Sequence, residues 1–493
     1  MSALVGVSPL LLLVVAGLSI MLIDAFTEDR AELAVVTAVS LFVAAAVAGA
    51  LLTGGELAAA PDLVTRYLAV DRLGLFFDVV ICVGAGLSVL LAGGYLREHG
   101  FERGEYYVLV LFTAFGAMIL ARAVDLLSIF LGLETMSLGA YALVAYRRTS
   151  ARAVEGAVKY FLLGSFAAAI LLFGSALLYG ATGHTDLVGI RASVEAGEAD
   201  AVLTIFALVM LIVGLAFKVG AVSFHMWVPD AYEGAATPVT TFMSVVVKSA
   251  AVAVLIRVLL GAFGDPSTMG LYTGWTPVII ILAVISMVYG NLAALAQSSV
   301  KRMLAYSSIA HAGYILVGFA AASEVGSFAV SAVLYYMAAY TVSNVLAFGS
   351  LILMGSKGKE AVSYDDLAGA GRRHPMAAFP FVIGVLSLLG MPPTAGFFGK
   401  YYVFSAAVQA GGVMVWVAVL GVLASAVGAY YYLKVIVYLY MREPEEDAPI
   451  AVPMQSTYVV VALVLAGYYV MKMGITPSRY LDWAVAAASS FVG

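Results

Sequence analysis

The chain has 493 residues, of which 63% are hydrophobic and 11% are charged, and its formal net charge is -5. Soluble globular proteins are about 45–50% apolar and about 25% charged, so this composition excludes a soluble protein and predicts a polytopic membrane protein in contact with the lipid bilayer. The small net charge and the lack of a basic tail exclude a nucleic-acid partner, and the one cysteine, Cys82, excludes a disulfide framework and any Cys-ligated metal or iron–sulfur site.

Apolar windows of about 20 residues, the length that crosses a bilayer as a helix, follow one another along almost the whole chain. Fourteen such spans are predicted, and the first is a retained helix because 1–26 lacks the positive region of a secretory signal. The longer polar connections, 53–72, 180–200 and 355–375, are expected to be interfacial loops. The predicted spans are 7–26, 34–53, 73–95, 106–122, 124–146, 157–180, 201–228, 238–262, 276–297, 304–321, 328–354, 376–406, 411–440 and 453–474.

Basic residues in the loops indicate the orientation, because cytoplasmic loops of membrane proteins are enriched in Lys and Arg. The side opposite to the loops after odd-numbered spans holds only Arg66, Arg72, Arg122, Arg191 and a few basic residues near the C-terminus. Both termini are therefore predicted to face away from the cytoplasm. The loops after odd-numbered spans hold Arg30, Arg97, Arg103, Arg147, Arg148, Arg152, Lys301, Arg302, Lys357, Lys359, Arg372, Arg373 and Arg442.

Short strings recur between the fifth and sixth predicted spans and the tenth and eleventh, at an offset of 173 to 175 residues. About five spans fit in that offset, and an odd number of spans turns the second copy upside down in the bilayer. The sequence therefore predicts two inverted five-helix repeats, as in many transport proteins, at 106–262 and 276–440, between an N-terminal three-helix segment (1–105) and a C-terminal helix and tail (441–493). The matching strings are Tyr141–Val144 with Tyr314–Val317, Ala157–Tyr160 with Ala332–Tyr335, and Phe173–Ser175 with Phe348–Ser350.

Each repeat of such a fold is expected to contain one interrupted helix, because ion sites in these folds are lined by freed backbone groups that face a cavity. The seventh span has helix-breaking residues from Ser223 to Pro238, including Pro229 and Gly234, and the twelfth has the run Gly390–Gly396. The sequence therefore predicts a broken helix in each repeat. The alternative is that the prolines only kink their helices and have no function.

Lysine and arginine are distributed differently between the predicted spans and the loops. Of sixteen arginines essentially only Arg257 lies in a span, whereas five of nine lysines lie within or at the ends of spans. A charge at the bilayer centre costs at least about 2.5–3.5 kcal/mol. Because a desolvated lysine can release its proton and arginine cannot, this distribution indicates proton transfer. The five lysines are Lys159, Lys218, Lys248, Lys400 and Lys434.

Glu134 lies in the middle of a span and is the predicted ion-pair partner of Lys218, which lies just before the break of the seventh span. A proton added to Lys248 would disfavour the charge on Lys218 and loosen that pair. His225, close to the break, is expected to pass a proton between the two lysines, and Lys400 is the expected terminal exchange site. The predicted site is a mid-membrane proton relay of Glu134, Lys218, Lys248, Lys400, His225 and Lys159.

Structural roles are open alternatives for several ionisable side chains. Lys159 begins its span, so its ammonium can instead reach the interface, and Lys434 can anchor a helix end. His225 and His311 can each be a hydrogen-bonded core histidine. Asp78 can simply pair with a neighbouring residue or with another subunit.

These residues resemble a known family, the antiporter-like membrane subunits of respiratory complex I, NADH:quinone oxidoreductase. The resemblance runs from about residue 70 to about residue 440. Two positions depart from the family pattern, because Ser223 and Ala236 stand where members commonly have proline. The most specific strings are Phe217–Gly220, Phe224–Ala235, Thr237–Thr240, Lys159–Phe166 and Gly396–Lys400.

The resemblance implies that Glu134 and Lys218 are the family's charged pair, Lys248 its central lysine and Lys400 its distal lysine. Lys400 argues against the middle member of the family, which typically has Glu at that position. The chain stops soon after the predicted fourteenth span, so the long lateral helix of the largest member is not expected.

The resemblance also implies a function: proton translocation across a bacterial inner membrane, as one module of a redox-driven pump among other membrane subunits. NADH, FMN, iron–sulfur clusters and quinone are then expected in partner subunits, and no cofactor is expected in this chain, which has no nucleotide-binding loop and no cluster ligands. Two alternatives from other classes stay open, a subunit of a multi-part Na⁺/H⁺ antiporter driven by ion gradients and a passive membrane scaffold.

Overall fold

The computed structural model describes residues 2–26, 32–54, 60–264, 274–355, 360–444 and 453–492. Across these ranges the regular structure is helical, and extended backbone pairs only at the isolated bridges Leu68–Ala123, Asp125–Asp186 and Ser299–Ser363. Thirteen of the described helices are long and apolar enough to cross a membrane. The predicted all-α polytopic membrane fold is confirmed.

The helices follow the predicted spans closely, and every predicted span overlaps at least one of them. The predicted span 376–406 is divided into two shorter helices, α18 (Pro375–Leu389) and α19 (Ala395–Ala410), which complete the predicted set of fourteen. The thirteen long spans are α1 (Ser8–Phe26, after a 3-10 turn at Ser2–Val7), α2 (Leu33–Thr53), α4 (Arg72–Glu98), α5 (Gly104–Arg122), α6 (Leu126–Val144), α7 (Ala151–Thr182), α9 (Ala201–Val219), α11 to α12 (Thr237–Ala262), α13 (Trp275–Leu295), α14 (Val300–Ala320, continued by α15, Ala322–Val325), α16 (Ser327–Met354), α20 (Gly412–Tyr440) and α21 (Thr457–Ile475).

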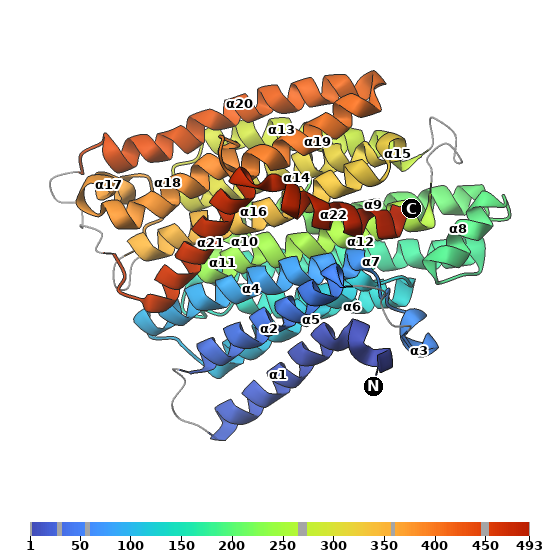
Figure 1. The fold of residues 1–493 in the computed structure, drawn as a ribbon, viewed down its shortest axis with the longest axis horizontal. Coiled ribbons are helices and arrows are strands. Elements are labelled where there is room, and N and C mark those ends of the chain that lie inside the picture. Colours follow the sequence, from blue (N-terminus) through green and yellow to red (C-terminus); the bar gives the residue numbers. More distant parts are fainter. Residues whose placement is uncertain are drawn as a thin grey trace.

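Short helices lie in the connections that the sequence predicts to be interfacial. α3 (Asp62–Thr65) follows α2, α8 (Leu187–Glu195) follows α7, and α17 (Ala370–Arg373) precedes α18, with a 3-10 turn at Asp365–Leu367 before it. In Figure 1, α8 and α17 lie at opposite ends of the bundle. Three of the basic residues used to predict the orientation, Arg30, Lys357 and Lys359, lie outside the described residues.

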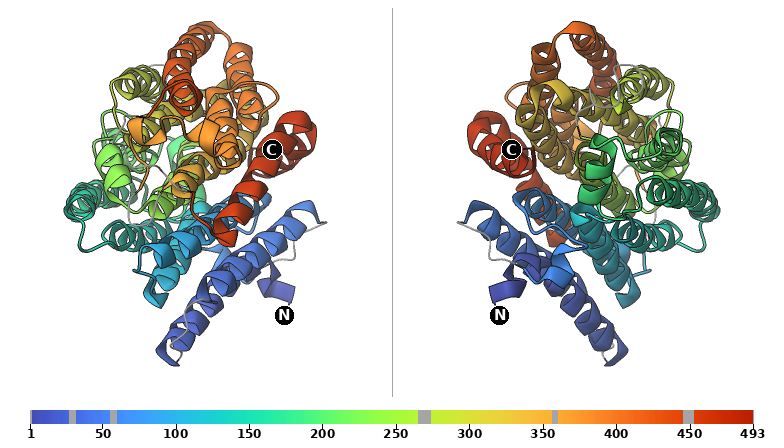
Figure 2. Two further views of the ribbon diagram at one scale, coloured as in Figure 1. Left: turned by 90° about the vertical axis from the view of Figure 1, so that its left-hand side faces the viewer. Right: turned by 90° about the vertical axis from the view of Figure 1, so that its right-hand side faces the viewer.

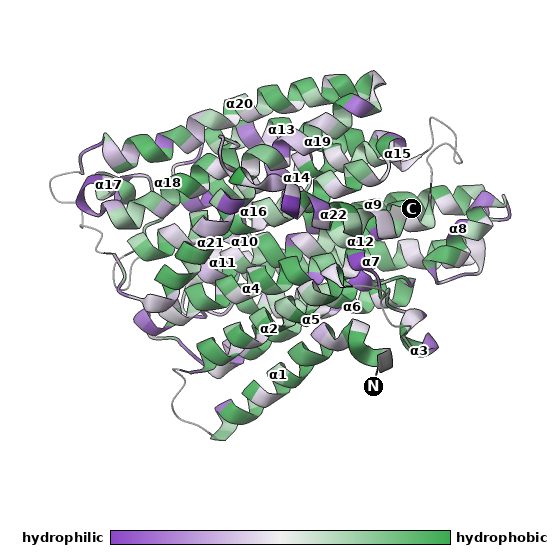
Figure 3. Ribbon diagram, in the orientation of Figure 1, coloured by the Kyte–Doolittle hydropathy of each residue, from purple (hydrophilic) through white to green (hydrophobic). Residues whose placement is uncertain are grey.

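The spans form one bundle in which the chain progresses from one edge to the other. In Figure 1, α1 lies at the lower edge and α20 at the upper edge, and the end views of Figure 2 show most helices nearly along their axes while α1 and α2 tilt strongly. α4, α14 and α16 are buried on nearly all sides. By contrast, α20 exposes Val413, Trp416 and Leu423, and Figure 3 shows that it is hydrophobic along most of its length. This outer surface is the one that a bilayer covers.

Polar side chains at the helix starts explain why many helices begin where they do. A side-chain oxygen at the position before the first helical residue accepts a hydrogen bond from a backbone N–H that has no partner within the helix. Such caps make the boundaries of seven helices predictable from local sequence. They are Asp71 of α4, Asp125 of α6, Ser150 of α7, Asp186 of α8, Asp200 of α9, Ser299 of α14 and Ser456 of α21.

The C-terminal tail is itself a helix that runs along the bundle. α21 starts where α16 ends, because the backbone N–H of Met454 donates to the carbonyl of Leu353 at 2.8 Å. After Thr476 the chain continues as α22 (Pro477–Val492), which packs on α4 and α16 and brings Phe491 to 5.7 Å from the guanidinium of Arg257 in α12. The segment expected to be a tail therefore covers part of α4 and α16.

Candidate functional site

The first interrupted helix is α9, which ends next to Lys218. Gly220 has φ of 78°, and the N–H groups of Gly220 and Ala221 both donate to the carbonyl of Ala216 at 3.0 Å. This left-handed turn is disfavoured for residues with a side chain, so the glycine ends the helix and leaves Lys218 in its last turn.

The chain resumes as α10 (Trp227–Gly234) and then as α11 (Thr237–Phe242). The interruption therefore covers 220–226, which is earlier than the predicted range of 223–238. The reason is that Pro229 lies in the first turn of α10, where a missing N–H costs nothing, so this proline helps a helix to begin and does not break one.

Lys218 is almost completely buried, with 2% of its surface exposed, and it is bound by hydroxyl groups of α6. Its ammonium donates to Oγ of Ser137 at 2.7 Å and to the hydroxyl of Tyr141 at 3.2 Å. Glu134 lies one turn before Ser137 and has a buried Oε1 without a hydrogen-bond partner. Ser137 accepts from the ammonium of Lys218, and Glu134, its predicted charge partner, interacts with it electrostatically without an ion-pair contact among the described residues.

Lys248 is the second buried lysine, and it begins α12 (Lys248–Ala262) directly after a π-helical turn, Met243–Val247. Its ammonium donates to the carbonyl of Ser308 in α14 at 2.6 Å and to the Oγ of the same residue at 2.5 Å. The ring of Tyr340 in α16 lies 5.3 Å from the nitrogen. Turns of this π type often occur at functional sites.

The second interruption separates α18 from α19 and places Lys400. Gly390 has φ of 90°, and its N–H and that of Met391 donate to the carbonyl of Leu386 at 3.0 Å, which confirms the predicted break. Lys400, in α19, reaches back to the carbonyl of Leu389 at 2.8 Å and to Oγ of Ser425 in α20 at 2.7 Å. The nitrogen also lies 5.0 Å from the ring centre of Tyr314 in α14.

His311 lies between the aromatic rings that contact Lys248 and Lys400. Its Nδ1 lies 2.5 Å from the hydroxyl of Tyr336 and its Nε2 lies 3.1 Å from the hydroxyl of Tyr432, which also bonds Ser307. The imidazole packs against Tyr314 and Tyr340, the two rings that face the lysines, and 3% of the residue is exposed.

The other predicted relay residues lie away from this cluster. His225 is half-buried and packs on Tyr289 at 4.9 Å, and its Nδ1 has no hydrogen-bond partner among the described residues. It lies within the interruption, just before α10 begins at Trp227. Lys159 is exposed over 44% of its side chain and pairs with Glu155 at 2.7 Å and Asp230 of α10 at 2.8 Å.

Two arginines are also buried, so the predicted separation of lysine from arginine is incomplete. Arg122 is fully buried and pairs with Asp78, and Arg257 pairs with Asp71 at 2.7 Å. Burial raises the pKa of the Asp71 carboxyl, but the guanidinium of Arg257 outweighs burial and holds that pKa below its usual value. Unlike Lys218, Lys248 and Lys400, these arginines each have a carboxylate within ion-pair distance, and they cannot release a proton, so they hold helices together.

The buried lysines, His311 and the hydroxyls around them form a site suited to proton transfer. Hydroxyl and imidazole groups can each donate and accept a proton, which allows a proton to move without a mobile carrier. Among the described residues no cluster of His, Cys, Asp or Glu has the arrangement of a metal site. Sequence analysis missed Ser308, Tyr336, Tyr340 and Tyr432, since only the packing of α14 against α16 and α20 brings them together.

Comparison with known proteins places the fold and its residues in a family. The family described as NADH:quinone oxidoreductase/Mrp antiporter, TM, matches residues 123–427. NADH-quinone oxidoreductase subunit N 1 of Sorangium cellulosum is 54% identical over 499 residues, which cover 98% of this chain and 98% of that protein. A chain of respiratory complex I from Thermus thermophilus with bound aureothin is 34% identical at a TM-score of 0.79, with 97% of this chain and 100% of that chain covered.

A chain of the Mrp complex from Dietzia sp. has a TM-score of 0.83, with 99% of this chain and 97% of that chain covered, but it is 20% identical and shows the fold alone. The family match covers residues 123–427, and the Sorangium cellulosum relative is 54% identical along nearly the whole length. This chain therefore belongs to the NADH:quinone oxidoreductase/Mrp antiporter family, and within it to the subunit N proteins of NADH-quinone oxidoreductase.

Proposed function

We propose that this chain translocates protons across the membrane as a subunit of NADH:quinone oxidoreductase, and that its buried lysines carry the protons. The observation that carries the proposal is the connected cluster of Lys248, His311 and Lys400. The two lysines are 4% and 8% exposed, have no ion-pair partner among the described residues, and contact rings that both pack on His311. A buried amine without a counter-ion is costly unless it can lose its charge, and losing a proton is the step that transport needs.

The proposed relay starts at Glu134 and Lys218 and continues through Lys248, His311 and Lys400. The hydroxyls that accept a hydrogen bond from a lysine of the relay are those of Ser137 and Tyr141 for Lys218, Ser308 for Lys248 and Ser425 for Lys400. Between Lys218 and Lys248 the described residues show no direct hydrogen bond, so this is the step at which water or a side-chain movement is required. His225 and Lys159 lie outside this line, and in this proposal they exchange protons at its margin.

NADH, FMN, iron–sulfur clusters and quinone are proposed to belong to partner subunits, as are the residues that react with them. The support is that this chain offers one cysteine and, in the described ranges, no metal cluster. Neighbouring antiporter-like and small membrane subunits are the proposed partners. Proton transfer in this chain then has to be driven by the redox reaction in the partner subunits.

The proposed location is a bacterial inner membrane with both termini on the non-cytoplasmic side. The distribution of Lys and Arg among the loops supports this orientation. Labelling of a cysteine introduced at Ser150 and one introduced at Thr182, in intact cells and in inverted vesicles, tests it. Ser150 should react only from the cytoplasmic side, and the opposite pattern would reverse the orientation.

We also propose that 106–262 and 276–440 are inverted repeats, flanked by the segments 1–105 and 441–493. The support is that each contains an interrupted helix ended by a left-handed glycine, at Gly220 and Gly390. The strings that match in sequence place Tyr141 in one copy and Tyr314 in the other, and each of these tyrosines contacts the lysine of its own copy. The two copies thus share a lysine, a tyrosine and an interrupted helix.

The complete NADH:quinone oxidoreductase, reconstituted in vesicles, provides the test. Replacing Lys248 by methionine should abolish most NADH-driven proton uptake, because the variant has no group that can bind a proton at the centre of the line. Lys434→Met is the matched control, since Lys434 lies beside Tyr364 near a helix end. Full pumping by an assembled Lys248→Met enzyme would favour the passive scaffold, and Na⁺-dependent transport without NADH would favour the antiporter.

A further inference from the structure

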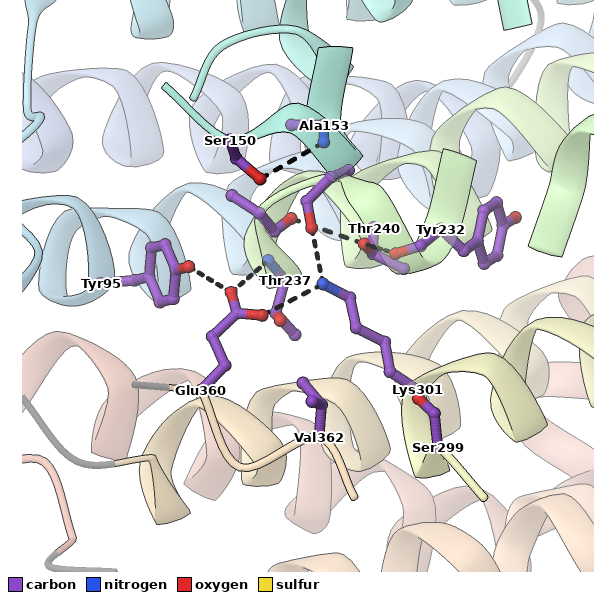
Figure 4. Close-up of polar contacts among 12 residues, drawn as sticks. Tyr95, Ser150, Ala153, Tyr232, Thr237, Thr240, Ser299, Lys301, Glu360 and Val362 are labelled. Atoms are coloured by element: carbon purple, nitrogen blue, oxygen red, sulfur yellow. Dashed lines mark hydrogen bonds and ion pairs between the residues drawn. The ribbon is translucent and has the colours of Figure 1, made fainter. Parts of the chain in front are cut away.

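A second buried charged cluster lies at the turn between α10 and α11, outside the proposed relay. Lys301, at the start of α14, is 1% exposed and donates to the carbonyl of Ala235 at 2.5 Å, and its nitrogen lies 3.3 Å from Oε2 of Glu360. The other oxygen of Glu360 accepts from the hydroxyl of Tyr95 and from the N–H of Thr237 at 3.3 Å. Figure 4 shows Glu360 and Lys301 side by side beneath this turn.

Each charge of this pair faces the helix end of opposite polarity. Ala235 follows the last residue of α10, so its carbonyl belongs to the negative end of that helix, while Thr237 begins α11 and its N–H belongs to the positive end. The ammonium of Lys301 and the carboxylate of Glu360 are therefore stabilised as ions, which explains how an ion pair can exist there.

Polar residues lead from this pair to Lys248 along α11 and the π-helical turn that follows it. Thr237, Thr241, Ser244 and Lys248 follow one another at spacings of four, three and four residues, so they lie on one face of the helix, and all are at most 4% exposed. At the near end Lys301 bridges from α14 to the α10–α11 turn, and at the far end Lys248 bridges back to α14. The pair and Lys248 thus lie at the two ends of a buried row of polar side chains, which we call the polar path.

Polar atoms without partners lie beside the far end of this path. The hydroxyl of Tyr340 and Oγ1 of Thr341, both in α16, are buried without a hydrogen-bond partner among the described residues. The ring of Tyr340 contacts Lys248, and Thr341 borders Gly84 together with Val245 of the π-helical turn. Buried hydroxyls in this state are sites where a water molecule gains hydrogen bonds.

The near end of the path adjoins a polar cavity at the predicted cytoplasmic end of the bundle. The cavity has a volume of about 340 Å³ and is lined by Glu155, Asp230, Gly234, Ser299 and Arg302, among others. Gly234 precedes Ala235, and Ser299 lies two residues before Lys301. The cavity therefore borders the residues that flank Ala235 and Lys301 in the chain.

Glu360 is suited to accept a proton at this position. Burial alone would raise the pKa of its carboxyl, but Lys301, the hydroxyl of Tyr95 and the N–H of Thr237 outweigh burial, and the pKa lies below its usual value. The side chain is therefore ionised at neutral pH. A carboxylate that protonates only briefly accepts a proton and passes it on, and does not store it.

We propose that Lys301 and Glu360 form a proton-uptake site, from which protons pass along the hydroxyls of α11 to Lys248. The inference rests on the proposed function of Lys248 as a proton carrier. A hydronium ion in the cavity gives one proton to the carboxylate of Glu360, which becomes neutral and loosens its pair with Lys301. Glu360 then releases this proton and becomes a carboxylate again, the hydroxyls along α11 and the π-helical turn each take one proton and release one, and the neutral amine of Lys248 becomes an ammonium.

The test uses the complete enzyme in vesicles and measures NADH-driven proton uptake. Glu360→Gln should lower the rate at least about tenfold, because the amide cannot take a proton, whereas Glu360→Asp should retain a substantial part of it. Asp365→Asn is the matched control, since Asp365 loses the same charge on the exposed side of the same loop. Rescue by aspartate distinguishes proton uptake from a purely structural role of the side chain.

A second variant covers the outcome that Glu360→Gln fails to assemble. Thr241→Val keeps the shape of the side chain and removes a hydroxyl that donates to the carbonyl of Thr237 within the same helix. It should assemble, slow proton uptake and change its solvent isotope effect. Unchanged uptake in Thr241→Val together with unchanged uptake in any assembled Glu360→Gln enzyme would overturn the uptake site.

Lys248→Met, measured in the same preparation, separates the two ideas. If Lys248→Met loses proton uptake while Glu360→Gln and Thr241→Val keep it, the proposed function stands and the uptake site at Lys301 and Glu360 is wrong. If all three variants keep full uptake, the proposed function itself fails. Loss in all three, with normal uptake in Asp365→Asn, supports both.

Discussion

The two interrupted helices end in the same way but receive their lysines from different parts of the chain. Gly220 and Gly390 both adopt the left-handed conformation, and each turn returns its N–H groups to the last carbonyls of the helix. Lys218 belongs to the last turn of α9 itself, whereas Lys400 comes from α19 and reaches back to the carbonyl of Leu389. Both ammonium groups therefore lie at the negative end of a half-helix, where a cation is stabilised. The comparison indicates that the electrostatic position is what the two halves share, and not the position in sequence.

The surroundings of the two lysines differ in how closed they are. Lys218 is 2% exposed and is held by two hydroxyls of α6, and the freed carbonyl of Phe217 is taken by the indole N–H of Trp227. Lys400 is 8% exposed and lines an open groove of about 1030 Å³ between α19 and α20. Lys218 thus lies in a closed pocket, whereas Lys400 borders an open, mostly apolar groove.

The largest effect is expected from replacing each lysine by arginine. This change separates two roles of the lysine, as a cation at the end of a helix and as a group that releases a proton. Lys218→Arg and Lys400→Arg keep a cation at the helix end but cannot release a proton, so NADH-driven proton uptake by the reconstituted enzyme should fall at least about tenfold in both. Lys434→Arg should pump normally. If either of the first two variants pumps at the normal rate, the lysine at that site serves only to cap its helix.

The second-largest effect is expected from replacing Gly220 and Gly390 by alanine. The two glycines share the left-handed conformation but have different neighbouring side chains. Alanine at either position should cost roughly 1–2 kcal/mol, because a side chain opposes the left-handed turn. A methyl group on Gly390 would lie 2.9 Å from Cδ of Lys400, whereas one on Gly220 would meet only Val228, at 3.0 Å. Thermal unfolding of the assembled enzyme should therefore shift similarly in both variants.

Proton uptake should distinguish the two glycine variants. Gly390→Ala should reduce it because Lys400 is displaced, whereas Gly220→Ala should leave it near normal in the molecules that assemble. Equal loss of uptake in both would show that the break itself, and not the lysine beside it, limits transport.

A smaller effect is expected from the hydroxyls that accept from the two lysines. Ser137→Ala leaves the closed Lys218 with Tyr141 as its hydrogen-bond acceptor, and this should cost about 1–2 kcal/mol in stability. Ser425→Ala should cost less, because Ser425 is partly exposed at the groove and water can replace its hydroxyl. The two are compared by thermal unfolding. A larger loss for Ser425→Ala would contradict the assignment of Lys218 as the closed site.

The helices could be predicted from sequence because apolar length and capping residues are local signals. The polar caps that begin α6, α9 and α14 lie next to the apolar runs they start, so the predicted spans meet the observed helices closely. The break of α9 was displaced because proline was treated as a breaker. Pro229 lies in a first turn, and a glycine without any proline nearby, Gly220, ends the helix.

The partners of the buried charges could not be predicted in the same way. His225 is close to Lys218 in sequence, yet the interruption turns it toward Tyr289, while His311 joins Lys248 and Lys400 from a different helix. Lys301 was placed in a loop and is buried at the start of α14. These contacts depend on how helices far apart in sequence pack, for which a single sequence carries no local signal.

The smallest expected effect is a difference in acid sensitivity between the two interrupted helices. The carboxylate of Asp230 in α10 accepts hydrogen bonds from Lys159 at 2.8 Å and from Arg302 at 2.9 Å. Burial acts to raise the pKa of this carboxyl, but the two cations outweigh burial, so the pKa lies below its usual value. A carboxyl with a lowered pKa stabilises the folded state above its unfolded pKa of about 3.9, and this contribution is lost as the pH falls through the folded value. α19 contains no Asp or Glu, so α10 alone should loosen as the pH falls below the unfolded pKa of about 3.9. Hydrogen exchange of α10 relative to α19 in the same sample measures this, since the ratio cancels the pH dependence of exchange itself. In Asp230→Asn the ratio should not change with pH, and a ratio that still rises in this variant would assign the acid sensitivity to another group.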